Sequence, residues 1–142
     1  MGKLTLTSPI LTNGEFRDGV WFVELAACAG PSENPALSAM LVAQAIARLF
    51  KRPEQASHAV LDSVQEYLAD KQLLLILDNC EHVVAACAEL SERLLQHCWQ
   101  LHILATSREE LRIPGETIYP VLPLTLPSPN EKVKERNRQI GQ

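Results

Sequence analysis

Short blocks of apolar residues, separated by polar and turn-forming residues, run along the central part of the chain. Residues 73–77 are apolar at five consecutive positions, a pattern typical of a central parallel strand that helices cover on both faces. Residues 20–25 and 101–105 are rich in strand-favouring residues and are followed by small or polar ones. These blocks predict three strands, and shorter strands are expected over residues 4–7 and 117–121.

Between the predicted strands, apolar residues recur at the spacing of one helix face. The pattern predicts a first helix that begins just after Pro35, carries its apolar stripe to Leu49 and is broken by Lys51-Arg52-Pro53, and two further helices over residues 57–69 and 82–98. Alternating strands and helices produce a parallel sheet with helical crossovers, so we predict an α/β fold in which helices flank a parallel sheet. The residues expected to face the core are Leu37, Leu41, Ala45 and Leu49, then Leu61, Val64 and Leu68, and finally Val83, Cys87, Leu90 and Leu94.

The composition supports one packed domain and argues against a nucleic-acid backbone as the main partner. Apolar residues make up 46% of the 142 positions and charged residues 21%. The net charge is −4, and residues 130–142 hold four basic and two acidic side chains, so the rest of the chain carries −6. Affinity for nucleic acid comes largely from Lys and Arg, and no helix-turn-helix is recognisable in this sequence. Direct nucleic-acid binding is therefore not expected.

Composition also suggests where the domain ends and where the protein resides. Prolines make the chain after residue 121 extended, so we expect a domain over residues 1–124 and a proline-rich exit with a charged tail over residues 125–142. No apolar stretch approaches the roughly 20 residues that span a bilayer, and the first residues lack a secretory pattern. We expect no membrane contact, a cytoplasmic location and reduced thiols at the four cysteines.

Two polar groups follow predicted strands, at the edge where parallel sheets bind ligands. Asp78 comes directly after the apolar run 73–77, and a carboxylate in that place suits a Mg²⁺ ion beside nucleotide phosphates. The alternative is that Asp78 caps the helix that starts near residue 82.

The second polar group is Thr106-Ser107-Arg108, which follows the predicted strand 101–105. The planar donor fork of Arg108 matches the oxygens of a terminal phosphate. The alternative is that Thr106 or Ser107 caps a helix while Arg108 forms a surface pair with Glu109 or Glu110.

Taken together, four segments resemble a known family. The apolar run followed by Asp-Asn-Cys-Glu-His over residues 73–82, and Ile-Leu-Ala-Thr-Ser-Arg-Glu over residues 103–109, resemble the STAND (NB-ARC-like) class of P-loop ATPases. The likeness is closest to the ATPase module of large bacterial transcriptional regulators of the LuxR and SARP types. Residues 18–25 look like the second strand of that family, and residues 119–124 are similar to its exit toward a helical lid.

The resemblance implies a Mg²⁺–ATP switch at the two predicted strand ends. Asp78 would hold the metal in the Walker B role, Arg108 would contact the γ-phosphate as a sensor, and Thr106 would belong to the ATP or ADP site. In relatives with two adjacent acids the second is thought to orient water, whereas here Asn79 stands in that place. Glu81 is a weak substitute, so slow or absent hydrolysis is expected.

The sequence departs from the family at the phosphate loop. The pattern Gly-x-x-x-x-Gly-Lys-[Ser/Thr], whose backbone amides hold phosphates, does not occur in the 142 residues. Residues 4–9 resemble the first strand and the opening of that loop, and residues 15–19 follow almost at once, as if the loop and its helix were deleted. We therefore expect an incomplete P-loop NTPase-like fold, and a degenerate or truncated ATP-binding module with weak or no ATPase activity.

Loss of that helix would leave one face of the sheet uncovered, and exposed apolar surface favours a protein partner or self-association. The alternatives to a nucleotide-binding module are a non-enzymatic interaction scaffold and a gene fragment without a function of its own.

Overall fold

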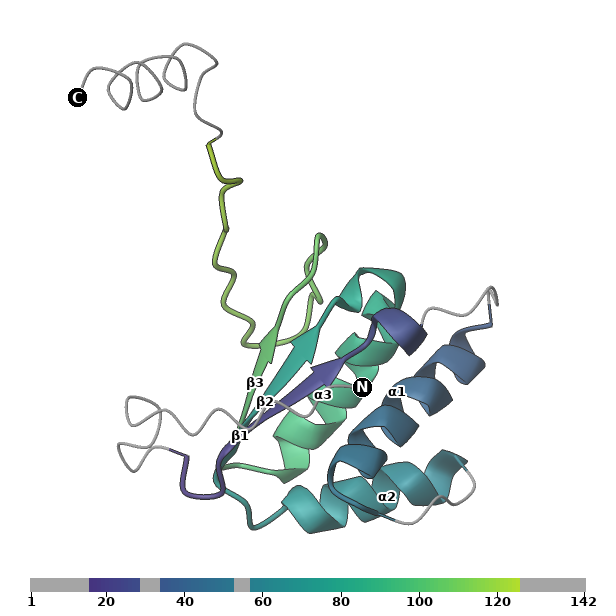
Figure 1. The fold of residues 1–142 in the computed structure, drawn as a ribbon. Coiled ribbons are helices and arrows are strands. Elements are labelled where there is room, and N and C mark those ends of the chain that lie inside the picture. The colour runs from purple at the N-terminus through teal and green to yellow at the C-terminus, as the bar shows by residue number, and fades with distance from the viewer. Residues whose placement is uncertain (1–15, 29–33, 53–56, 126–142) are drawn as a thin grey trace, which may run out of the picture.

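The structure is a computed structural model that describes residues 16–28, 34–52 and 57–125 (Figure 1). Strands and helices alternate along these ranges, as the sequence predicts. In chain order the elements are strand β1 (Val20–Glu24), the 3-10 turn η1 (Ala26–Cys28), helices α1 (Pro35–Leu49) and α2 (Ser57–Leu68), strand β2 (Leu73–Asp78), the 3-10 turn η2 (Cys80–His82), helix α3 (Val84–His97) and strand β3 (Leu101–Ala105).

The three strands form a parallel sheet with β2 in the middle. The strand order is β1-β2-β3, and both neighbouring pairs are parallel. The register places Glu24 beside Asp78, and Leu77 beside Ala105, so the last residues of the three strands lie along one edge. The α/β fold with a parallel sheet and flanking helices is therefore confirmed.

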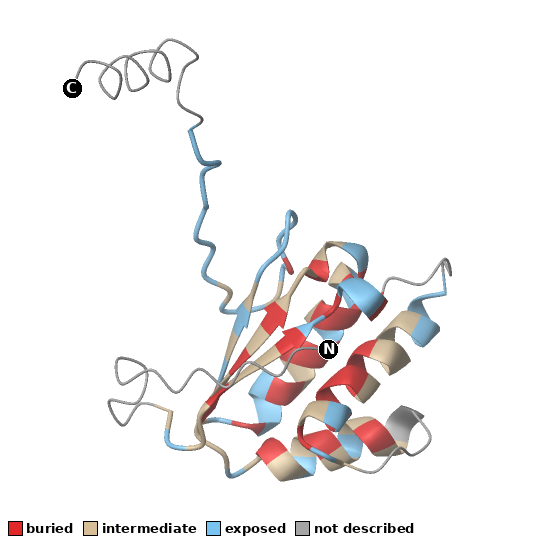
Figure 2. Cartoon of the chain, in the orientation of Figure 1, coloured by how far each residue is buried: buried red, intermediate tan, exposed pale blue. Residues whose placement is uncertain are grey.

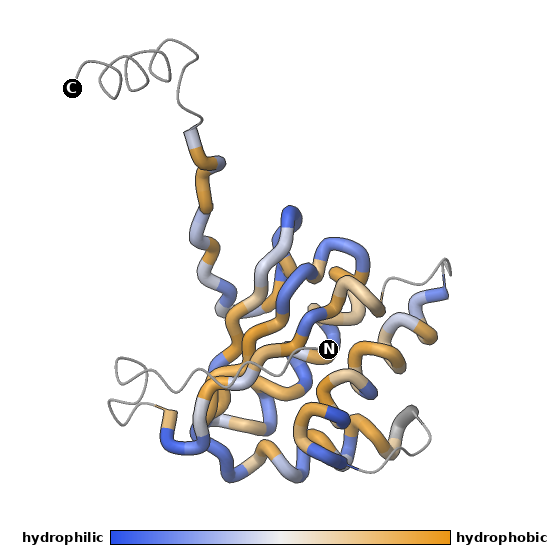
Figure 3. Tube along the Cα trace, viewed as in Figure 1, coloured by the Kyte–Doolittle hydropathy of each residue, from blue (hydrophilic) through white to orange (hydrophobic). Residues whose placement is uncertain are grey.

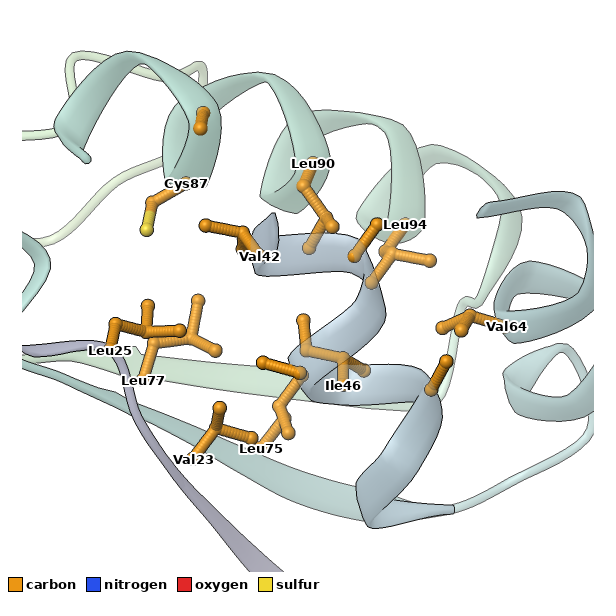
Figure 4. Packing of buried hydrophobic residues seen from close by; sticks show 14 of the residues in the cluster. Val23, Leu25, Val42, Ile46, Val64, Leu75, Leu77, Cys87, Leu90 and Leu94 are labelled. Carbon is orange, nitrogen blue, oxygen red and sulfur yellow. The ribbon is translucent and has the colours of Figure 1, made fainter. Parts of the chain in front are cut away.

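The described helices pack on one face of the sheet (Figures 1 and 2). Helix α1 contacts β1, α2 and α3, while α3 contacts β3. Val23 and Leu77 of the sheet belong to the same buried cluster as Val42 and Ile46 of α1 and Leu94 of α3 (Figure 4). Complete burial of one such side chain contributes about 1.5–3 kcal/mol, so this single cluster supplies most of the driving force for folding.

Within the described residues the opposite face of β2 is less covered, which differs from the expectation of helices on both faces and agrees with the expectation that a missing helix leaves one face uncovered. Leu73, Leu75 and Leu77 are fully buried, whereas Leu74 and Ile76 point to the other face and are half-buried. The described helices all belong to the first face, so an apolar run of five does not by itself indicate two covering layers. On the same open face, Leu104 of β3 is 52% exposed.

Helix α1 turns a different face to the core from the predicted one. Of the predicted residues only Ala45 is buried, while Leu37 is exposed and Leu41 and Leu49 are half-buried. The helix contains small or branched apolar residues around most of its circumference, so spacing alone does not define its inner face. Its buried residues are Val42, Ala43, Ala45, Ile46 and Ala47.

The predictions for the other two helices agree better with the structure. Val64 and Leu68 of α2 are buried as expected, and Leu61 is half-buried. The four core residues predicted for the third helix, Val83, Cys87, Leu90 and Leu94, are all buried. This helix starts later than predicted, because η2 takes up residues 80–82 before α3 begins at Val84.

The strand predicted over residues 117–121 is not present. Residues 117–125 are extended and exposed, and they project away from the rest of the described chain (Figures 1 and 2). Pro120 and Pro123 lack the N–H groups that a strand ladder needs. Figure 3 shows that hydrophobic positions nevertheless alternate with more polar ones along this segment. We call residues 117–125 the apolar arm; its exposed large side chains are Ile118, Tyr119, Val121, Leu122 and Leu124.

Two further predictions concern residues that the structure does not describe. The strand predicted over residues 4–7 lies outside the described residues, and so do the proline-rich exit and tail predicted over residues 125–142, apart from Thr125. Among the helices that the structure does describe, none is both long and apolar enough to cross a bilayer.

Candidate functional site

Asp78 and Thr106 lie in direct contact at the carboxyl edge of the sheet. Asp78 is the last residue of β2, and Thr106 follows the last residue of β3. The Thr106 hydroxyl donates a hydrogen bond of 2.5 Å to the Asp78 carboxylate at Oδ1. Because the strands are neighbours and parallel, two residues that are 28 positions apart in the sequence meet side by side.

Thr106 also holds the backbone that leaves β2. Its hydroxyl oxygen accepts a hydrogen bond of 3.0 Å from the N–H of Asn79. Its carbonyl accepts one from the N–H of Cys80 at 3.0 Å, and its own N–H donates to the carbonyl of Leu77 at 2.9 Å. We call these three contacts, together with the bond to Asp78, the Thr106 clip.

Asn79 occupies a left-handed backbone conformation inside the Thr106 clip. Its φ is 60° and its ψ is 54°. Asn is one of the few residues other than Gly that adopt this conformation at low cost. The sharp turn directs the chain from β2 into η2 immediately after Asp78.

The structure contradicts the alternative in which Asp78 caps the following helix. Asn79 precedes η2 and Val83 precedes α3, and neither makes a capping hydrogen bond with its side chain. The helix-cap alternative for Thr106 and Ser107 also fails, because residues 106–125 contain no helix. The Ser107 hydroxyl instead accepts a hydrogen bond of 3.2 Å from the N–H of Glu109.

Arg108 lies near the carboxyl edge of the sheet, and its side chain pairs with Glu81 rather than with Asp78 or Thr106. Its Nε is 3.9 Å from Oε1 of Glu81 in η2. The Arg108 side chain is 89% exposed, so water screens this ion pair and its contribution to stability is small. The surface pair with Glu109 or Glu110 is therefore replaced by a pair with Glu81, and the guanidinium remains accessible from solvent.

Glu24 is a candidate site residue that we did not predict from the sequence. It ends β1 and is the Cα register partner of Asp78, so the two side chains leave the same face of the sheet at neighbouring positions. Glu24 is exposed, whereas Asp78 is half-buried. The predicted strand 20–25 ends one residue later, at Leu25, so the pattern of that strand alone did not single out Glu24. Within the described ranges, no three His, Cys, Asp or Glu residues are grouped closely enough to hold a metal ion by themselves.

The four cysteines are buried free thiols. A hydrogen bond between Cys80 and Cys87 lowers the pKa of the Cys80 thiol and raises that of Cys87. Burial raises the pKa of the Cys28 and Cys98 thiols, because the charged thiolate is poorly solvated in the core. Cys80 also donates to the carbonyl of Leu77 at 3.5 Å, so this thiol supports the turn behind Asp78.

A hollow of about 210 Å³ opens beside the start of α1 and the start of α3. It is smaller than the roughly 300 Å³ at which small-molecule sites begin. Asp78, Thr106 and Arg108 do not line it, and we assign it no ligand. Its lining residues are Asn34, Pro35, Ser38, His82, Val83, Val84, Ala85 and Ala86.

Comparisons with known proteins relate the chain to part of larger bacterial proteins. Proteins of Mycobacterium tuberculosis and Mycobacterium bovis, each named "Putative HTH-type transcriptional regulator", are 38% identical to it over 121 residues. The match covers 85% of this chain but 13% of each relative, so the chain spans about an eighth of their length. A protein of Mycobacterium tuberculosis named "Uncharacterized protein" is 39% identical over 74 residues, which is 52% of this chain and 19% of that protein. No family model and no solved structure matches the chain.

Proposed function

We propose that this chain is a degenerate nucleotide-binding module of a STAND-type transcriptional regulator, with weak or no ATPase activity. The contact between Asp78 and Thr106 is the observation that supports it most directly, because it places the proposed metal ligand at the carboxyl edge of a parallel sheet. Four segments that resemble the family, in the family order, support the same reading. Relatives named as transcriptional regulators agree with the larger context.

The donors at this edge suit Mg²⁺ bound together with a nucleotide rather than alone. Mg²⁺ favours one or two carboxylates, several waters and substrate phosphates. Asp78 supplies one carboxylate, and because Thr106 occupies Oδ1, we assign Oδ2 to the cation. Glu24 lies beside Asp78 and offers a second carboxylate directly or through water. Bound Mg²⁺ would neutralise phosphate charge, which is the chemistry that the ion supplies.

In the proposal Arg108 contacts the terminal phosphate. Its side chain is exposed, and its pairing with Glu81 at 3.9 Å is loose enough to exchange for a phosphate oxygen at little cost. The guanidinium presents a planar set of donors that matches phosphate geometry. Release of Glu81 from Arg108 would accompany binding.

Two features of the sequence lead us to propose slow or absent hydrolysis. Asn79 stands where a second acid would orient water, and an uncharged amide does not act as a base. The glycine-rich phosphate loop does not occur in these residues, so its amides and its lysine do not contribute to phosphate binding here. The module would therefore bind nucleotide weakly and act through binding rather than turnover.

Calorimetric titration with ADP and ATP, with and without Mg²⁺, tests the proposal. We expect binding that depends on Mg²⁺ and is weakened at least about tenfold by Asp78→Ala, because removal of a metal ligand also removes its phosphate contact. Asp70→Ala is the matched control, since this exposed carboxylate lies before β2, at the opposite end of the strand from Asp78. Binding that Asp78→Ala leaves unchanged would contradict the role of Asp78, and absence of binding would overturn the nucleotide-binding proposal.

A protein-interaction scaffold is the second candidate, and the apolar arm favours it. Tyr119 is 86% exposed and Leu122 is 83% exposed. Contiguous apolar surface of this kind is rarely left exposed to water and often marks a binding site for a partner. Size-exclusion chromatography with light scattering distinguishes the two candidates. A scaffold would self-associate or bind a protein without nucleotide, and the double change Tyr119→Ser and Leu122→Ser would reduce that association. A monomer that binds Mg²⁺–ADP would support the first candidate instead.

A further inference from the structure

The Thr106 hydroxyl lies between two groups and uses its hydrogen on one of them. It donates to Asp78 Oδ1 at 2.5 Å and accepts from the N–H of Asn79 at 3.0 Å. A hydroxyl has a single hydrogen to donate. Since that hydrogen is directed at Asp78, it is not available to a phosphate oxygen. The hydrogen-bond geometry of the Thr106 hydroxyl therefore does not support a direct contact between Thr106 and the nucleotide.

We propose that Thr106 is a positioning residue that fixes the Asp78 carboxylate for a divalent cation, an inference that rests on the proposed function. The hydrogen bond to Oδ1 restricts the rotation of the carboxylate and leaves Oδ2 to face the cation. A metal ligand whose orientation is set by a neighbouring hydrogen bond binds more tightly, because less rotational freedom is lost on binding.

The second bond of the same hydroxyl links this orientation to the backbone. By accepting from the Asn79 N–H, Thr106 stabilises the left-handed turn that directly follows Asp78. The backbone of Asp78 is held independently, since its carbonyl accepts a hydrogen bond of 2.9 Å from the N–H of Leu25. One side chain, directly after β3, thus contacts both the Asp78 carboxylate and the turn at the end of β2.

The side-chain contribution can be separated from the backbone contribution by substitution. Thr106→Val keeps the shape and the branched Cβ but removes both hydroxyl bonds. The bonds from the Thr106 backbone to Leu77 and Cys80 do not involve the side chain and remain. Thr106→Ser keeps the hydroxyl and loses a methyl group. Ser107→Ala is the matched control, because Ser107 is the next residue and its exposed hydroxyl contacts Glu109.

The experiment measures two quantities on the full chain and its variants: hydrogen exchange at the Asn79 amide by NMR, and Mg²⁺–ADP affinity by calorimetry. We expect Thr106→Val to speed exchange at Asn79 by about threefold or more and to weaken Mg²⁺–ADP binding by about tenfold. Thr106→Ser and Ser107→Ala should stay within about twofold of the wild type in both. In the Asp78→Ala background, Thr106→Val should cause no further loss of affinity, because its effect acts through Asp78.

The possible outcomes separate this inference from the proposed function. Binding that Thr106→Val leaves unchanged, or further loss in the Asp78→Ala background, overturns the positioning role while the nucleotide site stands. Absence of Mg²⁺–ADP binding to the wild type overturns the proposed function, and it also overturns the cation-positioning role of Thr106, because that role depends on the proposed function. In that case unchanged exchange at Asn79 in Thr106→Val would show that the hydroxyl bonds do not hold the turn either.

Discussion

Glu24 and Asp78 end neighbouring parallel strands as Cα register partners, so two acidic side chains leave the same face of the sheet at adjacent positions. Like charges on adjacent strands repel, and their repulsion reduces stability unless a cation or a proton lies between them. We therefore predict that a divalent cation bound at this edge would raise the stability of the fold.

Glu24→Gln should show this link in thermal denaturation. Without divalent cations the variant should be as stable as the wild type or up to about 1 kcal/mol more stable, because one of the two charges is removed. In millimolar Mg²⁺ the wild type should gain more than the variant. Glu66→Gln on α2 is the control, since this exposed side chain is remote from the edge. Equal Mg²⁺ shifts in the wild type and Glu24→Gln would exclude a role for Glu24 at the cation.

Ser91 provides a prediction about stability that is independent of the site. Its hydroxyl, in the middle of α3, is fully buried and makes no hydrogen bond within the described residues. A buried hydroxyl without a partner costs roughly 1–3 kcal/mol relative to its hydrated state. Ser91→Ala should therefore raise the free energy of unfolding by about 1 kcal/mol, measured by urea denaturation.

The control for Ser91→Ala must separate hydroxyl burial from helix propensity, because alanine favours helices in any case. Ser38→Ala makes the same replacement in α1 at a half-buried position, where the hydroxyl donates to the carbonyl of Asn34 at 3.4 Å. We expect a smaller change, or a loss, for Ser38→Ala. If both variants gain equally, the gain comes from helix propensity and the burial explanation is wrong.

The sequence predicted the sheet and its polar edge because both depend on local pattern. Residues 73–77 form the central strand, and Asp78 and Thr106 meet where two parallel strands end. The partner of the Thr106 hydroxyl was not predictable, since it depends on the left-handed turn at Asn79 and on contacts 27 or more positions apart. Glu24 was missed for a similar reason, because strand register is set by packing and not by the residues of one strand.

The inner face of α1 and the apolar arm show two further limits of sequence pattern. The alanines and branched residues of α1 offer more than one apolar stripe, and packing against α2, α3 and β1 selects among them. In the arm, Ile118 and Val121 favour a strand, but no described strand lies beside them. Strand propensity forms a strand only where a neighbouring strand supplies hydrogen bonds.

Buried thiols should make the fold sensitive to alkaline pH. The pKa of Cys28 and of Cys98 is raised by burial above the ordinary value of 9.0, so both thiols stay neutral in the folded state at a pH that ionises them in the unfolded chain. Ionisation in the unfolded chain then favours unfolding. The free energy of unfolding should show no loss from these thiols well below pH 9.0 and should fall as the pH rises past it.

Urea denaturation at neutral pH and above pH 9.0 measures this effect. Cys98→Ala should lose stability at neutral pH, because a buried group is removed, but should decline less steeply with pH than the wild type. Lys and Tyr titrate in the same range, so the comparison between variant and wild type at each pH is the informative quantity. Parallel curves for the two proteins would rule out Cys98 as a source of the decline.

Glu116 supports the loop between Thr106 and the apolar arm. Its carboxylate accepts hydrogen bonds from the N–H of Leu111 at 3.0 Å and from the N–H of Arg112 at 2.7 Å. Arg112 has a positive φ of 58°, a backbone conformation that is unfavourable for most residues other than Gly and Asn. Leu111 is buried in the core cluster. The loop is therefore held by the burial of Leu111 and by the two hydrogen bonds to Glu116.

Glu116→Ala should therefore loosen the loop while the rest of the domain stays folded. Hydrogen bonds from amides to a carboxylate contribute about 1.5–3 kcal/mol each before allowance for solvent. Because Arg112 is exposed, water weakens these bonds, so we expect the free energy that holds the loop to fall by an amount near the lower limit. Limited proteolysis with trypsin should cut faster after Arg112. Glu116→Gln should have an intermediate effect, because its single amide oxygen accepts from only one of the two N–H groups at full strength.

Arg112→Gly provides the opposite test of the same loop. Glycine adopts a positive φ without steric cost, so the strain at position 112 is removed while both hydrogen bonds to Glu116 remain. The greater freedom of glycine in the unfolded chain offsets part of this gain. Arg112→Gly should therefore change stability by less than about 1 kcal/mol, and combined with Glu116→Ala it should not restore the order of the loop. If Glu116→Ala leaves cleavage after Arg112 unchanged, the carboxylate does not hold the loop, and burial of Leu111 alone accounts for its attachment.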